Sequence, residues 1–169
     1  IAHSEGTSAP YDSSAIKKAV KRTITPDYGE VTDITPDMRL TLKNAGHILG
    51  SALTHIHVGE GLHNILYTGD YNYDSSEMLR PADTNFQRVE TMITESTYGG
   101  RNDEQNPRED AQKKFLSKMK QTLSKGGKVI VPVFAVGRSQ EILGMLADEL
   151  DRDYFEYPVY MDGMINDAN

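Results

Sequence analysis

The chain has 169 residues, of which 37% are hydrophobic and 25% are charged, and it contains no cysteine. This length and composition suit a globular chain of one domain or a little more and exclude a disordered or fibrous protein. Without cysteine, disulfides and thiolate metal sites are excluded, so a bound metal would depend on His, Asp, Glu or water. The formal net charge of −7 argues against a freestanding nucleic-acid-binding module, because phosphate binding normally depends on clustered Lys and Arg.

The sequence gives no sign of membrane insertion or export. No stretch approaches the length of apolar sequence that a bilayer crossing needs, and residues 1–4 lack the basic and apolar regions of a signal peptide. We therefore expect a cytoplasmic protein with no membrane partner. The chain begins with Ile, and residues 157–163 predict a strand that opens a new unit. We therefore expect the sequence to be part of a longer protein.

The first part of the chain predicts a loop and a helix, followed by an antiparallel sheet. Residues 1–13 are rich in Ser, Gly and Pro, which is typical of a loop, and residues 14–21 predict a short amphipathic helix. Gly59 and Gly61 predict a tight hairpin between the strands expected over residues 52–58 and 62–68. Alternating apolar residues predict strands over residues 31–34, 39–43, 52–58, 62–68 and 89–94.

The second part of the chain predicts helices that alternate with strands. Asn106 is expected to cap a helix that begins at Pro107 and ends near Gly126, where glycine supplies the stop. In the strand that follows, Pro132 indicates an edge position or a bulge, because proline cannot donate a ladder hydrogen bond. A parallel, Rossmann-like sheet is predicted by this alternation. The elements concerned are a buried strand over residues 128–136, a helix over residues 139–150 and a strand over residues 157–163.

Three short segments each place one polar side chain at the end of an apolar stretch, beside glycines that allow close approach. These side chains are His47, Asp70 and Glu95. Each also has a structural interpretation: a hydrogen-bonded loop histidine, a turn aspartate, and a cap or turn glutamate. Because all three follow predicted strands, we expect them to be parts of one site.

In their order, residues 44–52, 67–71 and 94–100 resemble the third, fourth and fifth motifs of the metallo-β-lactamase-fold nucleases with a β-CASP domain. This is the family of the cleavage and polyadenylation specificity factor nuclease and of ribonuclease J, and the similarity is greatest to its archaeal members. The resemblance implies an α/β (α+β) fold. Residues 1–100 would form part of an αββα metallo-β-lactamase sandwich, and residues 101–169 would begin a Rossmann-like β-CASP domain.

The resemblance also implies roles for the three side chains. His47 would be a zinc ligand, and Asp70 would bridge two zinc ions. Glu95 would orient a zinc-bound histidine contributed by the later domain. Asp70 and Glu95 are therefore the candidate catalytic residues.

A further candidate lies where residues 137–141 lead from the predicted strand into the predicted helix. Free N–H groups and the positive end of a helix favour anions there. The family carries a similar Gly-Arg stretch, which implies that Arg138 and Ser139 contact RNA phosphates. An ordinary helix cap with a surface arginine is the alternative.

The sequence departs from the family by lacking its His-x-His-x-Asp-His metal motif and its two later histidines. His55 and His57 do not replace this motif, because Val58 and Gly59 follow them and strand alternation places both imidazoles on the same face as Leu53. We interpret both histidines as structural or surface residues. Since catalytic zinc normally needs at least three protein ligands, we expect the isolated chain to be inactive.

We expect the full-length protein to be a zinc-dependent ribonuclease with two Zn²⁺ ions in its complete active site. It would cut RNA as an endonuclease, and as a 5′-to-3′ exonuclease as some relatives do, in RNA 3′-end processing or transcription termination. The expected partners are RNA, the remainder of the two domains, and a second copy of the chain or an RNA-processing or transcription complex. Two alternatives stay open: a noncatalytic β-CASP scaffold subunit and a small-molecule metallohydrolase.

Overall fold

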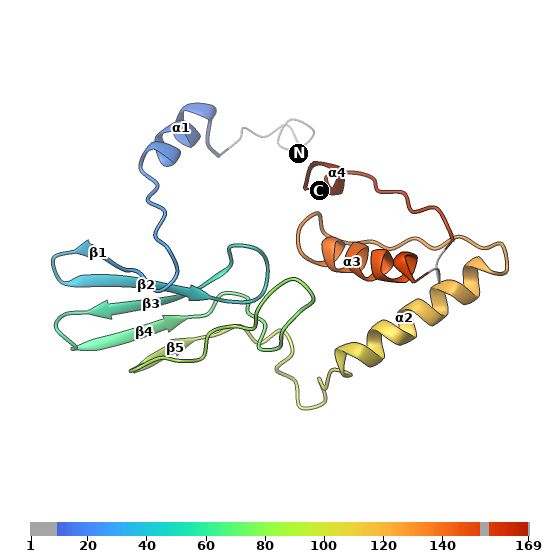
Figure 1. The fold of residues 1–169 in the computed structure, drawn as a ribbon. Coiled ribbons are helices and arrows are strands. Elements are labelled where there is room, and N and C mark those ends of the chain that lie inside the picture. The colour runs from blue at the N-terminus through green and yellow to red at the C-terminus, as the bar shows by residue number, and fades with distance from the viewer. Residues whose placement is uncertain (1–9, 153–155, 169) are drawn as a thin grey trace.

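The computed structural model describes residues 10–152 and 156–168 and has a mixed α and β architecture, as expected (Figure 1). The predicted loop over residues 1–13 lies mostly outside the described residues. A short helix comes first along the chain, a five-stranded sheet follows it, and the longer helices come after the sheet. In chain order the elements are α1 (Ser13–Lys21), β1 (Val31–Thr35), β2 (Met38–Asn44), β3 (Ala52–Val58), β4 (His63–Tyr67), β5 (Thr91–Ile93), α2 (Arg108–Leu123), α3 (Arg138–Asp151) and α4 (Ile165–Ala168).

The sheet follows the chain in the order β1-β2-β3-β4-β5. Strands β1 to β4 pair antiparallel, which confirms the predicted antiparallel sheet for these four strands. Strand β5 instead pairs parallel to β4, with Tyr67 opposite Ile93. Parallel neighbours end at the same edge of a sheet, so the residues that follow β4 and β5 emerge side by side.

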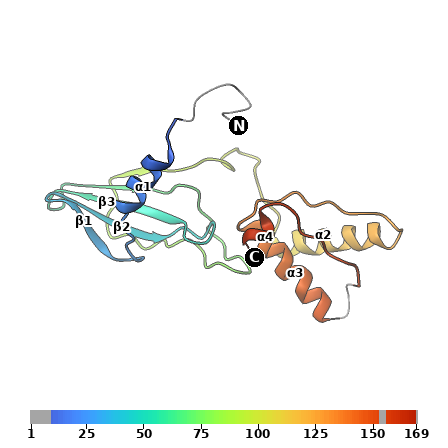
Figure 2. The same cartoon turned by 90° about the horizontal axis from the view of Figure 1, so that it is seen from above.

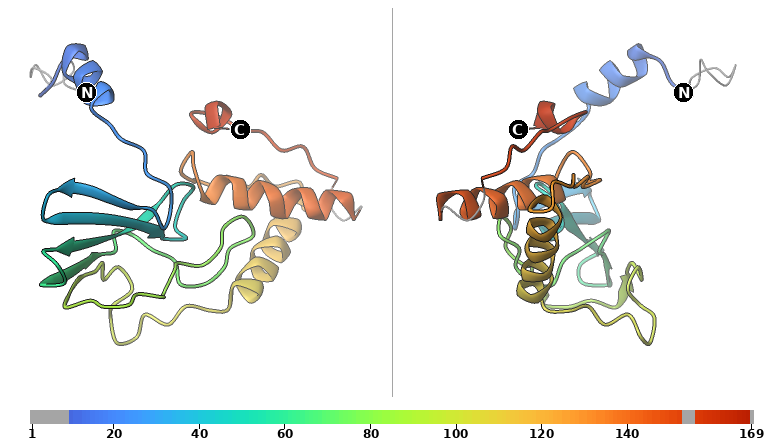
Figure 3. Two further views of the ribbon diagram at one scale, coloured as in Figure 1. Left: turned by 60° about the vertical axis from the view of Figure 1, so that its left-hand side comes forward. Right: turned by 90° about the vertical axis from the view of Figure 1, so that its right-hand side faces the viewer.

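The described residues form two separate hydrophobic clusters. In the first, Leu53 of β3 and Leu66 of β4 are buried together with Ala45 and Ala82. The second cluster joins the two longer helices through Met119 of α2 and Leu146 of α3. Figure 2 shows the sheet and these helices as two groups side by side, and Figure 3 shows α2 and α3 lying across each other. Helix α1 buries none of its residues.

The parallel strands predicted for the second part of the chain do not form. Residues 128–134 belong to no helix or strand, residues 135 and 136 lie in a turn, and residues 157–163 likewise contain no strand. The first segment keeps the exposure pattern of a strand, because Val129, Val131 and Val133 are partly buried whereas Ile130 and Phe134 are 90% and 86% exposed. A strand requires a neighbour that completes its hydrogen bonds, and the described residues supply none here.

The helix boundaries differ slightly from those predicted. The N-cap of α2 is Pro107 rather than Asn106, and the Pro107 carbonyl accepts N–H bonds from Asp110 and Ala111. Pro107 keeps an extended ψ of 137°, so the helix begins only after it. Helix α3 begins at Arg138, one residue earlier than predicted. No helix in the described part of the chain is long and apolar enough to cross a membrane.

Candidate metal centre

His47 lies on a tight loop that connects β2 to β3. The loop is closed at its base, where the Ala45 N–H donates to the Ser51 carbonyl at 3.1 Å. Gly46 is buried and has a φ of 66°, and a Cβ placed on it would lie 2.8 Å from both Ala82 N and Arg80 O. Only glycine fits this path, which turns the chain so that the His47 side chain is 45% exposed at the end of the sheet.

Asp70 lies three residues after the end of β4. Thr68 anchors this segment, because it is buried and its N–H donates to the Ile93 carbonyl at 3.0 Å. Gly69 follows with a φ of 53° and redirects the chain. Asp70 Oδ2 consequently lies 3.8 Å from His47 Nε2. The two side chains predicted to share a metal therefore do converge.

Glu95 lies two residues after β5 and reaches the loop that carries Asp70. Its Oε1 accepts a hydrogen bond from the Tyr71 N–H at 3.2 Å. The pKa of Glu95 lies below its usual value, chiefly because the Thr97 side chain and the Tyr71 N–H donate to the carboxylate. The nearby charge of His47 lowers this pKa further. Glu95 is thus an ionised carboxylate beside the His47 and Asp70 pair.

The donor set of this site suits zinc but is incomplete. One imidazole and carboxylate oxygens are ligand types that zinc accepts, whereas a catalytic zinc ion normally has three protein ligands. Across residues 10–152 and 156–168, no three His, Asp or Glu side chains come close enough together to hold a metal ion. The described residues therefore do not form a complete metal site by themselves.

The start of α3 approaches the His47 loop. A Cβ at Gly137 would lie 3.1 Å from Ile48 Cγ2, so the glycine lets the two segments touch. The neighbouring Arg138 has a side chain that is 63% exposed and pairs with Glu141 at 3.1 Å. Ser139 is only 2% exposed, and its hydroxyl donates to the Ala135 carbonyl at 2.8 Å. The predicted phosphate contact thus has an accessible side chain in Arg138, whereas Ser139 is engaged within the chain.

His55 and His57 are structural in this arrangement, as interpreted from the sequence. His55 is 4% exposed, and its Nε2 is hydrogen-bonded to the Arg88 carbonyl at 3.0 Å. His57 Nδ1 is hydrogen-bonded to Asn64 Oδ1 at 2.7 Å, and the two imidazole rings lie 4.2 Å apart. Both rings are therefore part of the packing between β3 and its neighbours.

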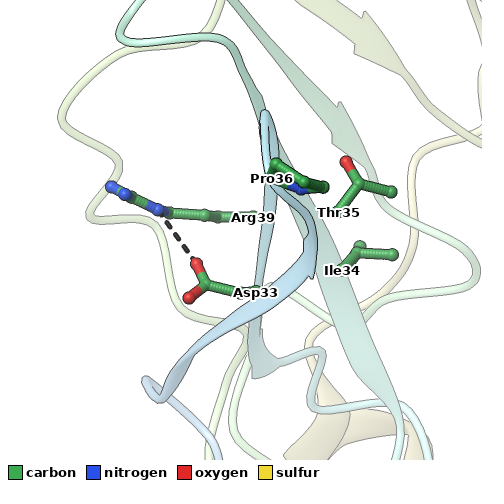
Figure 4. Close-up of a pocket in the computed structure, with 5 residues that line it drawn as sticks. All are labelled: Asp33, Ile34, Thr35, Pro36 and Arg39. Carbon is green, nitrogen blue, oxygen red and sulfur yellow. Dashed lines mark hydrogen bonds and ion pairs between the residues drawn. The ribbon is translucent and has the colours of Figure 1, made fainter.

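A shallow hollow of about 310 Å³ lies at the opposite end of β2 from His47. Figure 4 shows its lining, with Asp33 and Arg39 on adjacent strands. These two residues are cross-strand partners, and their side chains form an exposed ion pair at 3.1 Å. The hollow contains none of the predicted site residues, so we assign it no function.

Sequence reasoning missed the groups that hold the site together. Ser51, Thr97 and the N–H of Tyr71 all bond the loops that carry His47 and Glu95. For Ser51 and Thr97, the only signal in the sequence is a hydroxyl residue close to a predicted site residue. The N–H of Tyr71 leaves no signal at all, because every residue except proline has one.

Among curated proteins, the chain is similar to several archaeal proteins named transcription termination factor FttA. It is 52% identical to that of Methanothermobacter thermautotrophicus over 170 residues, which is 100% of this chain and 27% of that protein. For Thermococcus kodakarensis the identity is 51% over 168 residues, with 99% of this chain and 26% of that protein covered. The protein of a Lokiarchaeum species is 44% identical over 169 residues, which is 27% of its length. The chain is homologous to a segment of these FttA proteins.

This similarity confirms the resemblance to the archaeal branch of the metallo-β-lactamase-fold β-CASP proteins. The chain spans only 26% to 27% of the length of the FttA relatives described above. Their name assigns these relatives to transcription termination. No protein-family model matches the sequence.

Proposed function

We propose that this chain is part of a zinc-dependent ribonuclease that acts in transcription termination or RNA 3′-end processing. Residues 1–100 would belong to its metallo-β-lactamase domain, and residues 101–169 would begin its β-CASP domain. The observation that carries the proposal is the approach of His47 Nε2 to within 3.8 Å of Asp70 Oδ2, on loops that the sheet brings together. The name of the FttA relatives supports the proposed process.

The residues present have distinct roles in this proposal. His47 and Asp70 would hold zinc together with ligands from outside this chain, because two protein ligands are too few. Zinc bound there would bring the pKa of water close to neutrality and stabilise negative charge on phosphodiester oxygens. Glu95, kept ionised by Thr97 and Tyr71, would accept the N–H of a ligand histidine and so fix its tautomer.

Arg138 is the proposed RNA contact from the second domain. Its guanidinium is exposed at the first turn of α3, close to the His47 loop through the contact of Gly137 with Ile48. A guanidinium matches the geometry of a phosphate group and can bind it with two hydrogen bonds. The proposed partners are therefore RNA and the remaining parts of the two domains.

The test is Asp70→Ala in the full-length protein, with zinc content and RNA cleavage as readouts. We expect the variant to lose bound zinc and cleavage activity together, because the carboxylate is a proposed zinc ligand. Asp74→Ala is the matched control, since this exposed aspartate lies on the same loop and has no part in the proposed site. The control should retain both properties.

Each alternative function has its own outcome in this experiment. Undiminished cleavage by Asp70→Ala would refute the assignment of the site. A wild-type protein that cleaves no RNA favours a noncatalytic scaffold. Hydrolysis of a small thioester or lactone without RNA cleavage favours a small-molecule metallohydrolase.

A further inference from the structure

The side chain of Ser51 holds the backbone on which His47 lies. Its Oγ accepts a hydrogen bond from the N–H of His47 and another from the N–H of Ile48, each at 3.2 Å. The Ser51 N–H in turn donates to the Ile48 carbonyl at 3.0 Å. One serine therefore makes three hydrogen bonds to the short segment that presents the imidazole.

Ser51 is itself tied to the sheet, so it can serve as an anchor. It immediately precedes Ala52, the first residue of β3, which pairs with Asn44 at the end of β2. Its carbonyl accepts the N–H of Ala45 at 3.1 Å and the hydroxyl of Tyr28 at 2.8 Å. The anchor is thus joined to the start of the loop by a backbone hydrogen bond and to Tyr28 by a side-chain hydrogen bond.

Hydrogen bonds matter here because packing does little to hold the tip of the loop. Residues 47–50 are all exposed, and Leu49 is 82% exposed. An exposed loop that samples several conformations must be ordered when a ligand binds, and this ordering reduces affinity. A hydroxyl that fixes two successive N–H groups lowers this cost in advance.

We propose that Ser51 is a positioning residue of the metal centre, whose hydroxyl orients His47 for zinc through the backbone. This inference rests on the proposed function, because it takes His47 as a zinc ligand. Replacement of groups that orient metal ligands typically weakens metal binding about 10- to 100-fold. Since water can replace a hydroxyl at this exposed loop, we expect a loss near the lower end, about tenfold.

The test compares Ser51→Ala, Ser51→Thr and Ser76→Ala in the full-length protein. Ser76 is a matched control, because its Oγ likewise accepts two successive N–H groups, those of Met78 and Leu79, on a loop that does not carry His47. Zinc affinity is measured by competition with a chelator. Hydrogen exchange at residues 44–52 is measured in the metal-free protein.

The inference predicts that Ser51→Ala binds zinc about tenfold more weakly and exchanges faster at residues 47 and 48. Ser51→Thr should restore both properties, and Ser76→Ala should leave both unchanged. Wild-type affinity in Ser51→Ala would overturn the inference, as would failure of threonine to rescue or an equal loss in Ser76→Ala.

Failure of the proposed function has a different pattern. In that case the wild-type protein binds no zinc, or His47→Ala binds zinc as tightly as the wild type. The positioning role then falls with the metal site. If His47→Ala abolishes zinc binding while Ser51→Ala does not affect it, only the positioning role is wrong.

Discussion

At Gly46 the loop that carries His47 meets the backbone of the segment that follows Asp70. A Cβ there would lie 2.8 Å from Ala82 N, 2.8 Å from Arg80 O and 2.9 Å from Asn72 O. The contact is reinforced by Asn44, whose side-chain amide donates to the carbonyl of Pro81 at 2.9 Å. The two loops of the metal centre are therefore packed backbone to backbone, which leaves no space for a side chain.

We expect Gly46→Ala to destabilise the protein by about 3 kcal/mol or more, because the clash involves backbone atoms that cannot rotate away. Gly50→Ala is the control, since Gly50 also has a positive φ, of 80°, but nothing lies within 4 Å of a Cβ built on it. The control should cost only the left-handed conformation, about 1 kcal/mol. The free energy of unfolding in urea gives both values, and equal losses would contradict the close contact.

The residues of the candidate site could be predicted more readily than their supports. His47, Asp70 and Glu95 stand out because an ionisable side chain beside glycine at a strand end is a local pattern. That Glu95 accepts the N–H of Tyr71 depends on the pairing of β4 with β5, which no local pattern encodes. The burial of Ser139 likewise follows from packing around α3, so its predicted RNA contact gains no support.

Among the elements, β3 carries a buried titratable group whose protonation opposes folding. His55 has a pKa below its usual value of 6.5, chiefly because burial disfavours the charged imidazole. The neighbouring charges of His57 and Lys43 lower this pKa, whereas Glu90 and the hydrogen bond to the Arg88 carbonyl raise it. In the unfolded chain His55 takes up its proton at a higher pH than in the folded chain. The stability due to neutral His55 is therefore lost as the pH falls below 6.5.

We expect the free energy of unfolding to fall between pH 7.5 and 5.5, with His55 contributing up to about 1 kcal/mol. In His55→Gln this part of the pH dependence should disappear, because glutamine does not titrate. Urea unfolding of both proteins at the two pH values measures the difference. An unchanged pH dependence in the variant would show that His55 has the same pKa in both states.

The strands of the sheet form as predicted, whereas the strands predicted later in the chain do not form. The difference has one physical reason. Strands β1 to β4 find their partners nearby in sequence, so alternation and a hairpin glycine suffice to define them. The segment over residues 128–136 has the alternation of a strand, but a parallel partner must come from a distant part of the chain. The alternation of apolar residues indicates that a segment can form a strand, but a strand also needs a neighbouring strand to complete its hydrogen bonds.

For the whole molecule, this missing pairing leaves large apolar side chains exposed. Ile130, Phe134 and Tyr160 are 90%, 86% and 88% exposed. Exposed apolar patches of this kind promote association between molecules. The isolated chain should therefore bind a hydrophobic dye and self-associate.

We expect the double substitution Ile130→Lys and Phe134→Lys to reduce dye binding and to shift the isolated chain toward the monomer in sedimentation velocity. The double substitution Thr84→Lys and Gln87→Lys makes the same charge change at two exposed polar positions and controls for charge alone. If both variants behave alike, net charge rather than the apolar segment governs association.

The parallel pairing of β4 with β5 has a consequence for how the two carboxylates of the metal centre keep their separation. Neighbouring strands lie about 4.8 Å apart, and this spacing is a property of the backbone ladder. The distance between Asp70 and Glu95 is therefore set by the pairing of β4 with β5 and not by the long connection between these strands. Changes in the length of that connection, outside the residues that contact Gly46 and His55, could therefore accumulate while the distance between the two carboxylates is preserved.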